Sequence, residues 1–169
     1  MTLAGTEAGE SSKIIAEADV RNDWLQVGVV VGALFGLTTG LLLSVDGTMP
    51  EIGASIGVPT LLGGWVLHLT LSFVTCIAFA AALSTSRLSG YAGRLRTLLP
   101  MGLAFGLVAW VVLDMFLLAY VGVAVDAPGA VFPNFALEFA VINLVFGAVT
   151  ALFYYATRRW LITGRPAAQ

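Results

Sequence analysis

The sequence predicts an all-α integral membrane protein, a bundle of four transmembrane helices in up-down-up-down order. Hydrophobic residues make up 59% of the chain and charged residues 11%, whereas soluble domains are roughly half apolar and about one quarter charged. Four apolar segments come near to or exceed the roughly 20 residues that a helix needs to cross a bilayer. These segments are residues 24–45, 60–83, 98–123 and 134–157.

The basic residues predict the orientation of these helices. All eight lie before the first segment, between the second and the third, or after the fourth, and Lys and Arg close to spans are retained in the cytoplasm. They are Lys13, Arg21, Arg87, Arg94, Arg96, Arg158, Arg159 and Arg165. We therefore expect a multi-pass protein of the cell (inner or plasma) membrane with both termini cytoplasmic and loops 46–59 and 124–133 outside.

The segments outside the helices are shorter than the roughly 50 residues that a soluble domain needs. We expect a cytoplasmic N-terminal tail over residues 1–22, a transmembrane domain over 23–158 and a cytoplasmic C-terminal tail over 159–169. The first apolar segment is too long for the apolar region of a secretory signal, so it should remain as an anchor. Pro59 and Pro133 are expected to mark the starts of the second and fourth helices.

In the first apolar segment, glycines recur every four residues, which places them on one face of a helix. They are Gly28, Gly32, Gly36 and Gly40. Small residues let helix backbones approach closely in lipid, where the hydrophobic effect between helices is weak. The stripe therefore predicts a packing surface for another helix of the chain or for a second subunit, and chance scatter of glycines is the alternative.

The second segment carries a polar stripe. His68, Ser72 and Thr75 fall within about 60° of one another at about 100° per residue, so they share a helix face that should be buried in the bundle. Cys76 is the single cysteine of the chain, so no intramolecular disulfide and no multi-cysteine metal site is expected.

A shift of 70 residues aligns Gly32–Leu37 with Gly102–Leu107 through the shared string G-x-x-F-G-L, and the second helix with the fourth. Two duplicated hairpins would explain this match, and chance similarity between apolar segments is the alternative. Gly102 and Gly106, together with Gly147 in the fourth helix, are predicted to be packing positions as well.

Three ionisable residues, His68, Asp114 and Glu138, lie within the apolar segments, in the half nearer the outside. A charge at bilayer depth costs about 2.5–3.5 kcal/mol on insertion scales unless it faces protein or water, so these side chains should point inward. Together with Ser72 and Thr75 they form a candidate polar centre. Alternatively, each satisfies one helix–helix hydrogen bond, worth about 0.6 kcal/mol.

The expected function is that of a small non-enzymatic membrane protein, either self-associating or an accessory subunit of a membrane complex. One alternative is a proton- or cation-linked transporter or channel that uses His68, Asp114 and Glu138. Another is a haem-binding redox subunit with His68 and, as second axial ligand, Met115 or the histidine of a second copy.

Motifs of hydrolases, metalloproteases and phosphate-binding loops are absent from the sequence. We therefore expect no catalytic residue, no metal site, no cofactor and no nucleic-acid partner. The expected partners are the lipid bilayer and a second copy of the chain, as a homo-oligomer, or another membrane protein.

Overall fold

The computed structural model describes residues 4–85 and 87–163, with side chains described for 23–85 and 87–161. Within these residues every regular element is helical and no strand is present, which confirms the all-α class. Four helical stretches are long and apolar enough to cross a membrane, as predicted. They are Asp23–Asp46, Leu61–Ser84, Leu95–Ala124 and Leu137–Leu161.

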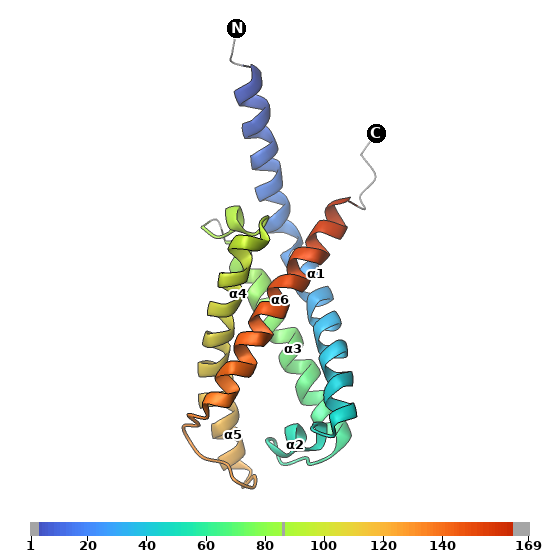
Figure 1. Ribbon diagram of the computed structural model, residues 1–169, viewed down its shortest axis with the longest axis vertical. Coiled ribbons are helices and arrows are strands. Elements are labelled where there is room, and N and C mark those ends of the chain that lie inside the picture. Colours follow the sequence, from blue (N-terminus) through green and yellow to red (C-terminus); the bar gives the residue numbers. More distant parts are fainter. Residues whose placement is uncertain (1–3, 86, 164–169) are drawn as a thin grey trace.

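The first hairpin consists of α1 (Ala4–Asp46) and α3 (Leu61–Ser84), with the short helix α2 (Met49–Ala54) folded against the start of α3 (Figure 1). The polar residues of the predicted N-terminal tail continue α1 as one helix from Ala4. The first turn of α3 is capped by Thr60, whose hydroxyl oxygen accepts a 3.0 Å hydrogen bond from the Gly63 N–H. Such a cap satisfies one of the N–H groups that have no partner within the helix.

The second hairpin pairs α6 (Leu137–Thr163) with a continuous rod of three elements, α4 (Leu95–Ala109), η2 (Trp110–Leu118) and α5 (Ala119–Ala124). The nine residues of η2 form a π-helix, in which hydrogen bonds span five residues and the turn is wider than in an α-helix. This π-helix was not predicted. A short 3-10 helix, η1 (Ser89–Tyr91), lies in the connection between the hairpins.

The last helix begins at Leu137, three residues later than predicted. The N–H of Asn134 donates to the Met115 carbonyl of the neighbouring rod at 3.0 Å, and its side-chain Oδ1 accepts from the Ala136 N–H at 3.1 Å. These two bonds hold the segment outside the helix, so Pro133 precedes an irregular stretch rather than the first turn.

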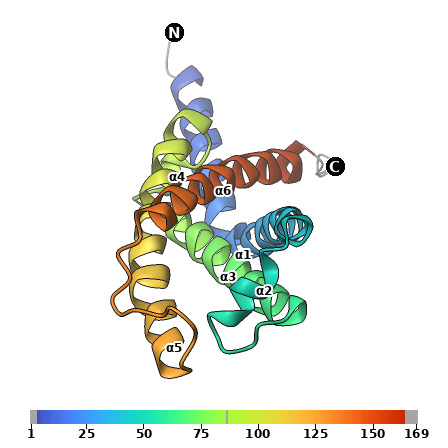
Figure 2. The same ribbon diagram turned by 60° about the horizontal axis from the view of Figure 1, so that its bottom comes forward.

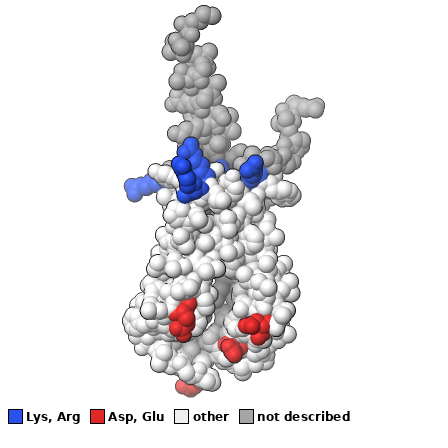
Figure 3. Space-filling model, viewed as in Figure 1, with Lys and Arg blue, Asp and Glu red and all other residues white. Residues whose placement is uncertain are grey.

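The two hairpins meet through aromatic side chains at the middle of the apolar helices and in the half that is nearer the chain termini. The ring centroids of Phe35 and Phe146 are 4.6 Å apart, and Phe79 lies 5.1 Å from Phe105 and 5.8 Å from Tyr154. α6 crosses over α1 and α3 in this half (Figures 1 and 2). Toward the opposite end the hairpins diverge, and the surface is hollowed between them (Figure 3).

Charge is separated along the molecule. Arginines gather at the end near the termini, and the acidic side chains on the visible face lie at the other end (Figure 3). This is the pattern on which the predicted orientation rests. Residues 1–3 and 164–169 of the predicted tails, Arg165 among them, lie outside the described residues, as do the side chains of Lys13 and Arg21.

Candidate functional site

The glycine stripe of α1 lies against α3, inside the first hairpin. A Cβ added to any of its four glycines would meet an atom of α3 at 2.5–3.0 Å, closer than side chains normally approach. Successive glycines, four residues apart in α1, contact residues that lie four positions earlier each time in α3, as expected for an antiparallel helix pair. The paired residues are Gly28 and Ile77, Gly32 and Phe73, Gly36 and Leu69, and Gly40 and Trp65. The stripe is thus covered by the chain itself.

The second hairpin is packed in the same manner but more closely. A Cβ on Gly102 would overlap the backbone carbonyl of Gly147, and a Cβ on Gly106 would overlap that of Asn143. If the two hairpins matched under the 70-residue shift, Gly102 would lie beside residue 143, just as Gly32 lies beside Phe73. Instead, Gly102 lies beside Gly147. The hairpins therefore share a packing mode, while their registers differ by one helical turn.

His68 lies in the first hairpin with its ring against α1. Its Nε2 is 2.9 Å from the hydroxyl oxygen of Thr39, and its Cδ2 is 3.2 Å from the Cβ position of Gly40. The Thr39 hydroxyl also donates to the Phe35 carbonyl, at 2.7 Å. With its single proton donated to the Phe35 carbonyl, the Thr39 oxygen accepts from the histidine. We therefore assign a proton to Nε2 of His68.

This assignment makes the second ring nitrogen of His68 an acceptor. When Nε2 carries the proton of a neutral imidazole, Nδ1 has a lone pair and no proton. Cδ2 and Nε2 form one edge of the ring and face α1, so the edge that holds Nδ1 is turned away from α1. The side chain is half-buried. His68 thus joins two helices through one nitrogen and offers the other as an acceptor.

Asp114 lies in the middle of η2, in the second hairpin. Its Oδ2 accepts a 2.8 Å hydrogen bond from the side-chain amide of Asn143 on α6, and the same amide donates to the Phe139 carbonyl at 2.8 Å. The amide nitrogen has two N–H groups, so both are used. π-helical segments are rare in proteins, and those that do occur often lie at functional sites.

The predicted polar centre is therefore divided between the hairpins. Thr39 and His68 are 29 residues apart, as are Asp114 and Asn143, and each pair joins the two helices of its own hairpin. Among the hydrogen bonds of the described residues, none joins His68 to Asp114 or to Glu138. The partners of the two ionisable residues, Thr39 and Asn143, are polar residues within apolar segments, and neither was among the predicted members of the centre.

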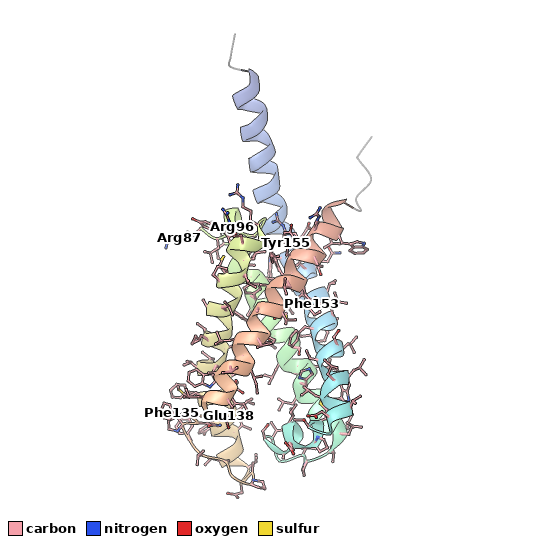
Figure 4. The ribbon with its side chains drawn as sticks, in the orientation of Figure 1. Arg87, Arg96, Phe135, Glu138, Phe153 and Tyr155 are labelled. Carbon is pink, nitrogen blue, oxygen red and sulfur yellow. The ribbon has the colours of Figure 1, made fainter. Side chains whose placement is uncertain are left out.

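The remaining members of the predicted centre take different positions. Glu138 is exposed in the first turn of α6, close to Phe135 (Figure 4), where the helix dipole stabilises a negative charge. Ser72 and Thr75 are only 3% and 6% exposed. The Thr75 hydroxyl donates to the Leu71 carbonyl at 2.5 Å, and Ser72 lies against the α1 glycine stripe.

Two buried polar atoms have no hydrogen-bond partner among the described residues, Nε1 of Trp110 and Oγ of Ser44. Leaving a buried donor unsatisfied costs about 1–3 kcal/mol. Trp110 precedes Asp114 by four residues in η2, which is close to one turn of the helix. An unsatisfied donor thus lies on the same rod as the carboxylate, about one turn away.

The described residues contain no group of three or more His, Cys, Asp or Glu side chains that could hold a metal ion. Met115, considered with His68 as a haem ligand, is buried in the other hairpin. Iron at Nε2 of His68 would have to replace the contact with Thr39. No protein-family model, curated protein or solved structure matches this chain.

Proposed function

We propose that this chain is a non-enzymatic integral membrane protein that acts as an accessory subunit of a complex in the cell membrane. One observation carries the proposal: His68 and Asp114, the ionisable side chains deepest in the apolar helices, each bond to a polar side chain on the adjacent helix of the same hairpin. Hydrogen bonds of this kind between membrane helices stabilise the helix pair, which is a structural role for both residues.

The proposed topology has four spans in up-down-up-down order, with both termini and the α3–α4 connection in the cytoplasm. The four apolar helices and the arginines at one end of the molecule support it. Large apolar side chains are exposed on the helices, for example Leu62 (73%) and Val145 (59%). Such a surface suits lipid or the helix of another membrane protein.

Self-association through the glycine stripes is not the form of assembly that we propose. The glycines of α1 already contact α3, and Gly102 and Gly106 already contact α6. A partner protein or a second copy would therefore pack against the exposed apolar faces, where side chains rather than backbones meet.

The test is ion flux in liposomes that contain the purified protein. The structural role predicts no proton or cation flux above that of protein-free vesicles. Asp114→Asn should change stability by about 0.6 kcal/mol, the average value of a hydrogen bond between membrane helices. Glu138→Gln is the matched control, because it removes a carboxylate that is exposed. A wild-type pH-dependent flux that Asp114→Asn abolishes and Glu138→Gln preserves would refute the accessory role.

A proton- or cation-linked transporter is the second candidate, and the surroundings of Asp114 favour it. The carboxylate lies in a π-helical segment, about one turn from the unsatisfied N–H of Trp110. A solute that accepts a hydrogen bond from the indole would satisfy this donor. The flux measurement described above decides between the two candidates.

A further inference from the structure

One face of α3 lies opposite one face of α6. The Phe79 ring on α3 is 5.8 Å from the Tyr154 ring on α6, measured between ring centroids. His68 precedes Phe79 by 11 residues, and Asn143 precedes Tyr154 by 11 residues. Eleven residues are three helical turns to within about 20°, so each residue shares the helix face of that ring. Both helices run toward the chain termini (Figure 1). His68 and Asn143 therefore face each other roughly 16 Å further out.

The hairpins diverge at this level, between two contacts. On the inner side the ring centroids of Phe35 and Phe146 are 4.6 Å apart, and Phe146 is about one turn inward of Asn143. On the outer side the Ser55 carbonyl oxygen lies 3.7 Å from the Cβ position of Gly122. The hollow between the hairpins (Figure 3) lies between these contacts, so its two sides carry the facing residues of α3 and α6.

Three polar atoms on the two sides are free hydrogen-bond acceptors. Asn143 uses both of its N–H groups as donors, which leaves Oδ1 as an acceptor. Within the described parts of the chain, no hydrogen bond reaches Nδ1 of His68 or Oδ1 of Asp114. Neither atom is buried, because the buried side-chain polar atoms without a partner there belong to Ser44 and Trp110. A ligand in the hollow would therefore meet three acceptors, one of them on a carboxylate.

The outer end of the hollow is acidic. Residues 46–59 and 124–138 contain four acidic residues and no Lys or Arg, a formal charge of −4. The acids are Asp46, Glu51, Asp126 and Glu138. A concave surface with charges of one sign raises the local concentration of ions of the opposite sign. The hollow therefore favours cations over anions.

We propose that the hollow binds an ammonium group, either the ammonium ion or a small primary amine, between His68 and the Asp114–Asn143 pair. Such a group has several N–H donors, a positive charge and no acceptor. It thus matches a set of acceptors that includes a carboxylate oxygen. This inference goes beyond the proposed accessory role, because it concerns binding and not transport.

The experiment is thermal unfolding of the purified full chain in detergent, titrated with four chloride salts at constant ionic strength. A ligand that binds the folded chain raises the unfolding midpoint by mass action. Ammonium and methylammonium should raise it in a saturable way. Potassium and tetramethylammonium carry the same charge but have no N–H to donate, so neither should raise it. A lower half-saturating concentration for methylammonium than for ammonium would assign the site to an amine, and the reverse order would assign it to the ion.

Two carboxylate variants test the position of the site. Asp114→Asn should raise the half-saturating concentration of methylammonium by about tenfold or more, because a hydrogen bond to a charged group is worth roughly that factor. The new asparagine can still accept from Asn143, so the hairpin keeps this contact. Glu138→Gln removes an exposed carboxylate from the acidic rim and should change the half-saturating concentration by about threefold or less.

A second pair of variants tests the imidazole. Both His68→Phe and Thr39→Val remove the hydrogen bond between α1 and α3, but only His68→Phe removes the acceptor in the hollow. We expect weaker binding of methylammonium by His68→Phe and nearly unchanged binding by Thr39→Val. Each variant is compared with its own midpoint in the absence of ligand, so a loss of stability does not imitate a loss of binding.

Three results would overturn the inference. The first is an equal shift by all four cations, which would mean that the acidic rim is merely screened. The second is no shift by any of them, and the third is an equal effect of Asp114→Asn and Glu138→Gln. The flux measurement in liposomes tests the accessory role separately, so the two proposals can fail independently.

Discussion

Replacing Gly106 by alanine tests whether direct backbone contact holds the second hairpin together. The added Cβ would overlap the Asn143 carbonyl oxygen, and its next neighbours are the Asn143 carbonyl carbon at 2.9 Å and the Leu144 Cα at 3.3 Å. These are backbone atoms that cannot rotate away. Van der Waals contact needs about 3.5–4.0 Å, so α4 and α6 must separate by about 1 Å or more.

Overpacking of this kind costs about 1–3 kcal/mol. Alanine has a higher helix propensity than glycine by about 1 kcal/mol, which offsets part of the cost. The displaced residue, Asn143, also donates the 2.8 Å bond to Asp114, which should weaken. We therefore expect Gly106→Ala to lower the free energy of unfolding by about 1–2 kcal/mol, or about 5- to 30-fold in the equilibrium constant.

The assay is unfolding by sodium dodecyl sulfate in mixed micelles, followed by tryptophan fluorescence. Two other glycines calibrate the result. At Gly36 the nearest atom to an added Cβ is the flexible end of Leu69, at 3.0 Å, and at Gly93 it is Nη1 of Arg158, at 3.6 Å. The loss of stability should fall in the order Gly106→Ala, Gly36→Ala, Gly93→Ala. Equal stability of the Gly106 and Gly93 variants would refute the reasoning.

Three further predictions concern other contacts. Thr39→Val should cost about 0.6 kcal/mol, and a double-mutant cycle with His68→Phe should show coupling; additive losses would mean that the pair does not interact. Phe79→Ala should destabilise the chain by about 3–5 kcal/mol and increase the distance between the two hairpins in spin-label measurements. An unchanged distance would show that other contacts hold the two hairpins together. Gly90 is exposed in the α3–α4 connection, which the proposed orientation places in the cytoplasm. In a Cys76→Ala background, Gly90→Cys should therefore react with an impermeant maleimide only in opened cells. Reaction in intact cells would refute the orientation.

The apolar helices follow from local features of the sequence. Length and hydropathy are properties of a segment, so the four apolar stretches predicted the four long helices of the structure. Thr60 shows the same principle at a helix start, because its cap depends on a residue three positions away. The predicted start of α6 was wrong because Asn134 bonds to Met115, a residue distant in the sequence.

The partner of each interacting residue was decided by the tertiary structure. A stripe such as Gly28 to Gly40 suits a helix of the same chain or of another, and only the folded chain places α3 on it. Likewise His68 and Asp114 could have met in one site, but each bonds within its own hairpin. A hydrogen bond between helices depends on their rotation and register, which the backbone contacts of the glycines set. The apolar helices and the ionisable residues could be identified from the sequence, because both are local properties. Which of them touch is a non-local property that packing decides.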